Sequence, residues 1–276
     1  MRGRIAYSTA LLAITCGSLL AAAQDKPDAP PCGAEEIARG AVARIGDGRT
    51  LTLADGREVR LAGIEVPPLP LPREENAPPG GLAVKAALEA LTGGAEVALR
   101  RAQASPDRYG RLVAYAYVLK DGDPTFVQSE LLAKGLARTG DRIGGPACAA
   151  ELMRRERDAR AAGLGLWANP YYAVLDAGTP AAVVAQKGRF ALVEDQVESV
   201  HESGATIYVN FGRHWSEDFA VTVLKRNERN FAAAGLDLKR LAGRRVRVRG
   251  FVEERGAAGS PWIEAARPEQ IETVGP

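Results

Sequence analysis

Apolar and polar residues alternate on both sides of Asp55-Gly56, a dipeptide that favours the tight turn of a β-hairpin. We therefore predict two paired strands, near residues 50–53 and 58–64. Similar short runs before and after the hairpin predict three more strands. The five strands predicted in this half of the chain cover residues 41–45, 50–53, 58–64, 96–101 and 112–119.

Three other segments of this half are predicted to be helical. Residues 82–91 have helical composition, residues 127–136 place their leucines on one side, and residues 147–162 carry Glu156 and Arg160 at the i,i+4 spacing of an ion pair. A run of prolines predicts a loop over residues 66–79. Five strands interleaved with helices predict a mainly β domain with an OB-type barrel, which we place at residues 40–168.

The second half of the chain is predicted to be a separate β domain. Residues 169–182, which contain Pro170, Gly178 and Pro180, are interpreted as a linker. One helix is expected near residues 227–234. The strands predicted in this half cover residues 190–200, 206–211, 219–224, 245–252 and 261–265. This order predicts a second small OB-like barrel at residues 183–276.

The first residues are typical of a secretory signal peptide. Arg2 and Arg4 precede an apolar run that ends in three alanines at Ala23, so we predict cleavage after residue 23. An uncleaved membrane anchor is the alternative, but the run is short for a span. Residues 24–39 are then a disordered spacer. The mature protein is expected in the periplasm or outside the cell, with no stable membrane insertion.

Export changes the interpretation of the cysteines and of the charge. Loss of the signal leaves Cys32 and Cys148, which in an oxidising compartment most simply form one disulfide; two free buried thiols are the alternative. Two of the 36 Lys and Arg are also lost, which leaves as many cations as the 34 Asp and Glu. A neutral chain has no global attraction for nucleic acid, so any such contact needs a local patch.

The order of several short motifs resembles the thermonuclease (staphylococcal nuclease-like) family over about residues 41–167. No single motif is specific, but their order and spacing together are. The markers are Asp47-Gly-x-Thr50, Arg60-Leu61, Gly63-Ile-Glu-x-Pro67, Asp107-Arg-Tyr-Gly-Arg111, Leu132-x-x-Gly-Leu-Ala137 and the tail that runs from Cys148 through Glu156 and Arg160 to Trp167. Residues 208–271 look like the OB-like module found behind some exported nuclease-like domains.

The resemblance implies a site for phosphodiester cleavage. In that family two aspartates and a backbone carbonyl hold one calcium ion, a glutamate acts as general base or positions water, and two arginines clamp the phosphate. Both arginines are retained here, as Arg60 and Arg111, together with the outer aspartate of the turn, Asp47, and the family's tyrosine, Tyr109. The ion-side aspartate is Arg49, the second ligand is Glu65, the following threonine is Val66, and the catalytic glutamate is Pro68.

These departures predict that calcium-dependent catalysis is absent or strongly impaired. Arg49 places a guanidinium where a cation needs an oxyanion, and Pro68 has no side-chain base. We expect Arg49 to fill the ion site and pair with Glu65 or Asp47. No cofactor is therefore expected; Asp47 and Glu65 are the metal candidates if a calcium-dependent activity is retained. The alternatives are an ion pair of Arg60 with Glu65 and a solvated Arg111.

A second candidate surface lies in the C-terminal half. Arg245, Arg247 and Arg249 alternate with valines, so they share one face of a strand. With Tyr208, Phe211 and Trp215 this face could bind a nucleic-acid strand. The alternative is a solvent-facing strand side with the aromatic rings in the core.

Three functions follow from these observations. The first is an exported nuclease homologue that binds DNA, RNA or another polyanion through Arg49, Arg60, Tyr109 and Arg111 without calcium-dependent hydrolysis. The second is an active secreted or periplasmic endonuclease with a rearranged site. The third is an exported protein-interaction or structural module. The changes at Arg49 and Pro68 favour the first and the third.

Overall fold

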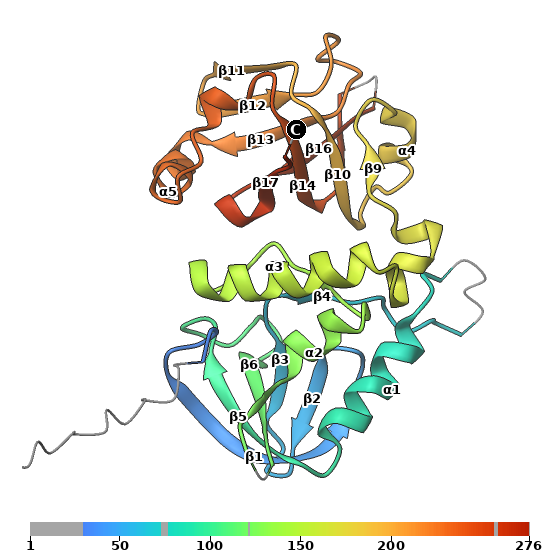
Figure 1. Ribbon diagram of the computed structural model, residues 1–276, viewed down its shortest axis with the longest axis vertical. Helices are drawn as coiled ribbons and strands as arrows, with labels where there is room; N and C mark the ends of the chain where they lie inside the picture. The colour runs from blue at the N-terminus through green and yellow to red at the C-terminus, as the bar shows by residue number, and fades with distance from the viewer. Residues whose placement is uncertain (1–29, 73–76, 121, 257–258, 276) are drawn as a thin grey trace, which may run out of the picture.

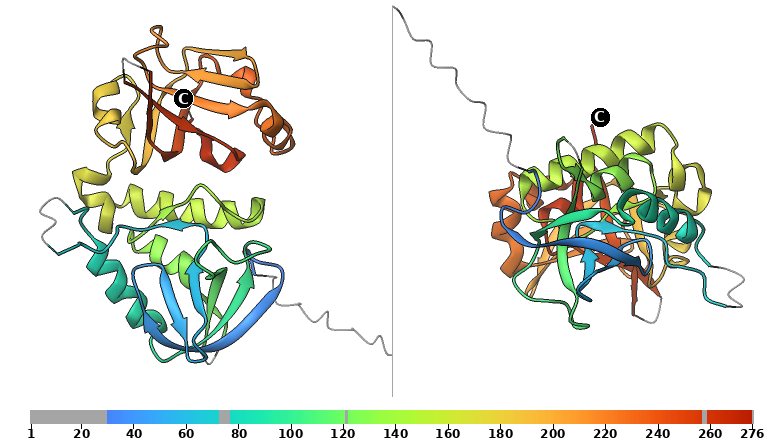
Figure 2. Two further views of the ribbon diagram at one scale, coloured as in Figure 1. Left: turned by 180° about the vertical axis from the view of Figure 1, so that it is seen from behind. Right: turned by 90° about the horizontal axis from the view of Figure 1, so that it is seen from below.

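The computed structural model describes residues 30–72, 77–120, 122–256 and 259–275. Two β-rich modules lie one above the other, with helix α3 (Pro146–Ala161) between them (Figures 1 and 2). The signal peptide predicted over residues 1–23 lies outside the described residues, as do residues 24–29 of the predicted spacer. No helix in the described ranges has the length and apolar character needed to cross a membrane.

Five strands of the first module close into a ring, as the sequence predicts. The strands of this module are β1 (Glu36–Ile45), β2 (Thr50–Leu53), β3 (Glu58–Leu61), β4 (Ile64–Glu65), β5 (Glu96–Arg101), β6 (Leu112–Leu119), β7 (Thr125–Phe126) and β8 (Arg138–Thr139), and its other helices are α1 (Gly81–Thr92) and α2 (Val127–Ala133). The antiparallel pairs β1–β2, β2–β3, β1–β5 and β5–β6 and the parallel pair β3–β6 form the ring. Alternate residues such as Leu51, Val59 and Leu61 point inward and are almost fully buried.

The first strand begins at Glu36, so the predicted spacer is wrong for residues 36–39. These residues pair with β5. Several contacts hold the chain against the ring before the strand begins. Among them, the Tyr117 hydroxyl donates to the Cys32 carbonyl (2.8 Å), and the Arg100 guanidinium donates to the Gly33 carbonyl (2.5 Å). Tertiary contacts of this kind have no local signal in a run of Pro, Ala and Asp.

The predicted disulfide is confirmed. Cys32 and Cys148 form a bond across 116 residues of sequence, and both cysteines are fully buried. The bond ties the segment just before β1 to α3, so the alternative of two free thiols is wrong.

The second module repeats the pairing order of the first. Its strands are β9 (Leu175–Asp176), β10 (Phe190–Gln196), β11 (Ser199–Ser203), β12 (Thr206–Asn210), β13 (Ala220–Leu224), β14 (Arg245–Phe251), β15 (Glu253–Arg255), β16 (Ser260–Glu264) and β17 (Ile271–Thr273), and its helices are α4 (Pro180–Val184) and α5 (Glu228–Ala233). β11–β12, β12–β13, β15–β16 and β10–β14 pair antiparallel, and β13–β16 pair in parallel. Because β10 runs into β11 and β14 into β15, the order matches the predicted OB-like arrangement.

The segment predicted as a linker, residues 169–182, instead contributes to the second module. β9 pairs in parallel with β10, and α4 places Val183 fully inside the second core. Pro180 occupies the first turn of α4, where a missing N–H is tolerated. The proline that suggested a linker therefore starts a helix.

A buried ion pair joins the two modules. Arg249 of β14 donates to Glu156 of α3 (Nη1 to Oε2, 2.8 Å), and the two side chains are 1% and 0% exposed. Glu156 also accepts from Arg160 (2.8 Å), the pair predicted from the sequence, and from the Thr139 backbone N–H (2.5 Å). Burial would raise the pKa of Glu156, but Arg249, Thr139 and Arg160 outweigh it and lower that pKa.

Candidate functional site

A break after β3 positions the charged residues of the hairpin. Gly63 has a φ of +74° and turns the chain out of the ring into β4, which pairs with β8. A Cβ at this position would also lie 2.9 Å from Leu152 Cδ1, so glycine is strongly favoured here. The single strand predicted over residues 58–64 is therefore two strands, with Arg60 on the ring and Glu65 beyond it.

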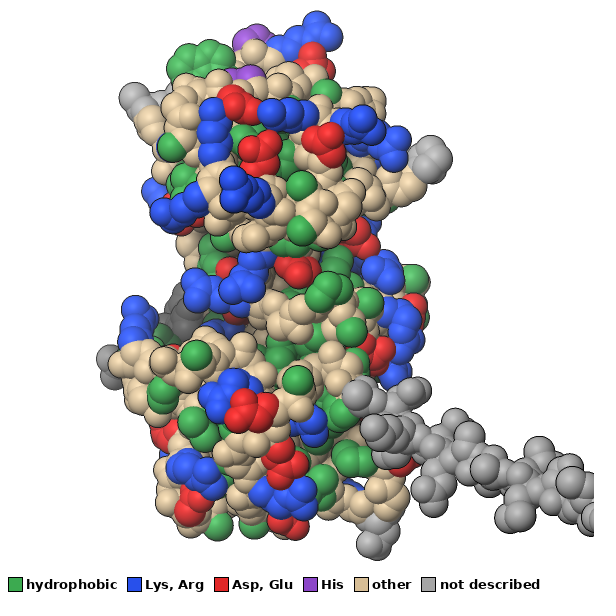
Figure 3. Space-filling view, turned by 90° about the vertical axis from the view of Figure 1, so that its left-hand side faces the viewer, with side chains coloured by type: hydrophobic (Ala, Val, Ile, Leu, Met, Phe, Trp, Pro, Cys, Tyr) green, Lys and Arg blue, Asp and Glu red, His purple; other side chains and the backbone are tan. Residues whose placement is uncertain are grey.

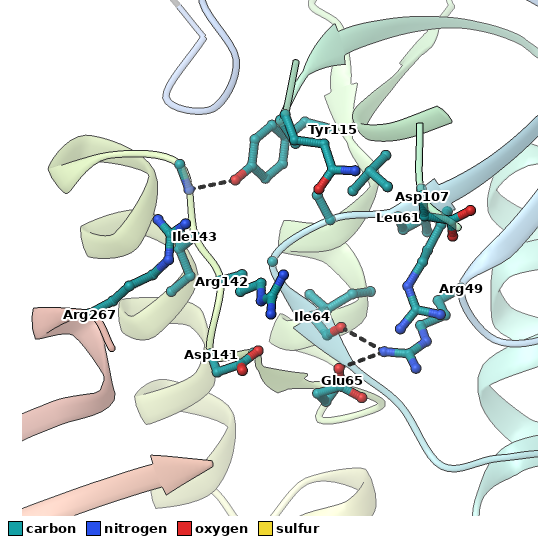
Figure 4. A pocket seen from close by; sticks show the side chains of 18 of the residues that line it. Arg49, Leu61, Ile64, Glu65, Asp107, Tyr115, Asp141, Arg142, Ile143 and Arg267 are labelled. Atoms are coloured by element: carbon teal, nitrogen blue, oxygen red, sulfur yellow. Dashed lines mark hydrogen bonds and ion pairs between the residues drawn. The ribbon is translucent and has the colours of Figure 1, made fainter. Parts of the chain in front are cut away.

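Arg49 pairs with Glu65, one of the two partners predicted from the sequence. Its Nη1 lies 2.6 Å from Glu65 Oε1 and 3.4 Å from the Ile64 carbonyl oxygen, to which it donates (Figure 4). The two side chains are only 19% and 15% exposed, so the pair is shielded from solvent. The Asp47 carboxylate accepts the Arg49 backbone N–H (2.8 Å) and so fixes the turn.

This arrangement does not fit a calcium ion. Calcium takes six to eight oxygen ligands, whereas here a guanidinium occupies the Glu65 carboxylate. Pro68 is exposed and offers no proton acceptor. Among the residues that the structure describes, no three His, Cys, Asp or Glu side chains are grouped to hold a metal ion.

Arg60 is a half-buried cation, and no hydrogen bond or ion pair of its side chain occurs within the described ranges. Burial lowers its pKa, and the neighbouring Arg49 and Arg111 lower it further, against the opposing charges of Glu65 and Asp107. The alternative in which Arg60 pairs with Glu65 is wrong, because Glu65 pairs with Arg49. An anion bound to Arg60 would offset the free-energy cost of burying its charge and the repulsion from Arg49 and Arg111.

Arg111 has a carboxylate partner. Its Nη2 lies 2.7 Å from Asp107 Oδ2, and both side chains are 16% exposed, so it is not the solvated residue of the alternative interpretation. Burial would raise the pKa of Asp107, but hydrogen bonds from Arg111 and from the Tyr109 backbone lower it. Tyr109 is 64% exposed, with Arg108 and Arg111 against its ring at 4.8 and 4.9 Å.

A cavity of about 450 Å³ lies beside Arg60 and between the two modules; we call it the inter-module cavity. Arg142, from the loop after β8, and Arg267, from the second module, reach it from the side opposite Arg49 (Figure 4). Neither side chain forms an ion pair with a described residue. In the view of Figure 3, Lys and Arg side chains gather beside a hollow at the waist between the modules.

The inter-module cavity has an excess of positive charge. Four arginines line it against three acids, and two of those acids, Glu65 and Asp107, are already paired. A neighbouring cavity of about 390 Å³ is also lined by Arg49 and Glu65 and adds Arg138 and Arg189. The Arg49–Glu65 pair thus borders both cavities, and cations from both modules surround it.

Sequence reasoning missed Arg142 and Arg267. Each follows a turn-rich stretch with no periodic pattern, and Arg267 comes from a different module. In the sequence, Arg142 is marked only by its neighbour Asp141 and Arg267 only by its neighbour Pro268. Such dipeptides are too common to indicate a binding site. The pairing of β4 with β8 and the docking of the second module bring them to Arg60.

The structure contradicts the predicted binding surface on β14 at Arg249, and the other two arginines of this surface have a carboxylate partner. Arg249 is buried against Glu156, and Arg247 and Arg245 both pair with Glu194. The three arginines do share one side of the strand, but at Arg249 that side faces α3 rather than solvent. The two-residue period of a strand shows which side chains share a face, but it does not show what packs against that face.

Comparison with known proteins assigns the first module to a family. No protein in the curated set matches the chain. Residues 58–169 match the family model described as staphylococcal nuclease homologue. The match includes Arg60, Glu65, Pro68 and Arg111 but begins after Arg49. The first module is therefore a domain of the staphylococcal nuclease homologue family, followed here by an OB-like second module.

Proposed function

We propose that this protein binds DNA, RNA or another polyanion at the inter-module cavity and does not hydrolyse it by a calcium-dependent mechanism. The family of the first module indicates a function of the nuclease or nucleic-acid-binding kind. The observation that carries the proposal is Arg60, a half-buried guanidinium with no counter-ion among the described residues, in a cavity lined by three further arginines.

Phosphate suits such a site on physical grounds. A guanidinium presents a planar fork of donors to phosphate oxygens. Arg142 and Arg267 can approach the same anion from the other wall, so the bound group would touch both modules. A polyanion would release counterions as it binds, which makes the affinity fall with salt.

Loss of hydrolysis is supported by the same pocket. The Arg49–Glu65 pair removes an oxyanion from metal binding and puts a positive charge beside it. Hydrolysis also needs an activated water, and Pro68 cannot accept its proton. What remains is an anion site with charge stabilisation but without the ion-side aspartate and the glutamate base of the family, whose positions are Arg49 and Pro68.

We also propose that the protein acts outside the cytoplasm. The disulfide is of the kind that persists in oxidising compartments. The predicted signal peptide points the same way.

Replacing Arg60 by glutamine should weaken oligonucleotide binding roughly 10- to 100-fold at low salt, the effect of losing one charge-assisted hydrogen-bonded contact. The slope of the logarithm of affinity against the logarithm of salt concentration should fall in magnitude by about one, the contribution of one phosphate contact. Arg267→Gln should also weaken oligonucleotide binding, because it also removes a cation from the cavity wall. Fluorescence anisotropy of a labelled strand over a salt series measures both quantities.

Arg57→Gln provides the matched control. Arg57 is an exposed arginine paired with Asp55 in the hairpin turn and does not line the cavity. Equal binding by wild type, Arg60→Gln and Arg57→Gln would refute the proposal. Retention of no polyanion by the wild type would instead support the alternative of a protein-interaction module.

A further inference from the structure

The second module carries a separate cavity of about 450 Å³ on the sheet that contains β11 and β12. Figure 1 shows these strands at the end of the second module that lies away from α3. The cavity is lined by His201, Ser203, Tyr208, Asn210, Trp215 and Arg255. It shares no lining residue with the inter-module cavity.

Aromatic and planar side chains dominate this cavity. His201 and Tyr208 are cross-strand partners whose rings stack at 5.1 Å with an interplanar angle of 12°. The Arg255 guanidinium lies 5.2 Å from the Tyr208 ring centre. Trp215 is 71% exposed. Aromatic rings and an arginine plane that remain open to solvent are the usual partners of a stacked planar ligand.

The loop that presents Trp215 is held in place although the tryptophan itself is exposed. The Asp218 carboxylate accepts the His214 backbone N–H (2.7 Å), and the loop closes through the Phe211 N–H and the Phe219 carbonyl (3.1 Å). Gly212 allows this closure, since a Cβ there would lie 2.1 Å from the Asp218 carboxylate. The backbone that carries Trp215 is thus held before any ligand binds, which lowers the backbone entropy lost on binding.

Asn210 adds an amide with unused hydrogen-bonding capacity. It is 4% exposed, its Nδ2 lies 3.2 Å from Ser199 Oγ and 3.0 Å from His201 Nδ1, and its Oδ1 has no partner. A buried amide oxygen without a donor costs free energy until a donor reaches it. A ligand ring that carries N–H groups on its edge could supply that donor after a small shift of the side chain.

We propose that this cavity binds a nucleobase of a single-stranded nucleic acid, stacked against Trp215 and the His201–Tyr208 pair. A base is a planar ring with a hydrogen-bonding edge, which matches the stacking surfaces and the Asn210 amide. None of the described residues that line the cavity is acidic, and Arg255 is cationic, so the attached phosphate is tolerated. This site extends nucleic-acid binding to the second module and does not depend on Arg60.

The test compares a labelled oligothymidylate with an abasic strand of equal length, by fluorescence anisotropy at low and high salt. Wild type should bind the strand with bases more tightly, and this preference should persist at high salt because stacking is not ionic. Trp215→Ala and Tyr208→Ala should each weaken base-dependent binding about tenfold. Leu82→Ala, which removes an apolar side chain that is 66% exposed on α1, should leave binding unchanged.

Different results would reject the base site and the inter-module cavity as binding sites. Equal affinity for both strands, or unchanged binding by Trp215→Ala and Tyr208→Ala, would overturn the base site and leave the inter-module cavity untouched. Base-dependent binding that persists in Arg60→Gln, with no salt-sensitive component in wild type, would uphold the base site and reject the inter-module proposal.

Discussion

Replacing Glu156 by glutamine should lower the free energy of unfolding by about 3–5 kcal/mol, the range for breaking one partner of a buried ion pair. The change leaves Arg249 buried beside a neutral amide and weakens the hold of α3 on β14. Arg160 loses the same partner. Urea unfolding followed by intrinsic fluorescence measures the effect, and we expect the two modules to separate into distinct transitions.

Two variants control for this result. Asp158→Asn removes an exposed carboxylate from the same helix and should cost less than about 1 kcal/mol. Glu156→Gln combined with Arg249→Met removes both charges and should be less destabilised than the single variant. A Glu156→Gln variant as stable as wild type would contradict the role assigned to this pair.

The contribution of the Glu156–Arg249 pair to stability should also depend on pH. The pKa of Glu156 is lower in the folded state than its usual value of 4.5, so its stabilising contribution is complete above that pH and is lost as the pH falls below it. The stability difference between wild type and Glu156→Gln should therefore shrink on acidification.

Removing the Cys32–Cys148 disulfide should lower the free energy of unfolding by about 4–5 kcal/mol in the chain-entropy model, because the bond closes a loop of over one hundred residues. We expect the double variant Cys32→Ala/Cys148→Ala to unfold at a markedly lower urea concentration than the oxidised protein. The two sulfur atoms are buried, so a reductant must be present throughout the unfolding series.

The double alanine variant also serves as the control for the reductant. Reductant should shift the wild-type midpoint toward that of the variant and leave the variant where it is. A wild-type midpoint that is unchanged by reductant, together with a double variant as stable as the oxidised protein, would show that the bond adds no stability.

Local features and the disulfide were predictable, and other contacts between distant segments mostly were not. Asp55-Gly56 specifies its hairpin through backbone preferences that need no partner, and the cysteine count together with the predicted signal peptide was enough to predict the disulfide. The start of β1 at Glu36 depends instead on contacts of Cys32 and Gly33 with side chains 67 or more residues away.

The candidate site shows the same division. Motif spacing identified Arg49, Arg60 and Glu65, and the position of Arg49 at the ion site of the family suggested a pair with Glu65 or Asp47. Arg267 reaches the cavity only because the second module docks on α3, and the same docking buries Arg249, which had looked like a binding residue. The sequence alone does not distinguish an arginine buried in an interface from an arginine that binds a ligand.

The central claim is that the family fold here retains an anion site without calcium-dependent cleavage. It is tested most directly by incubating the protein without its predicted signal peptide with single- and double-stranded DNA and RNA, in calcium or in chelator, and scoring cleavage and retention together. We expect intact substrates in both conditions and retention that weakens with salt. Cleavage that appears with calcium and disappears with chelator would contradict the claim.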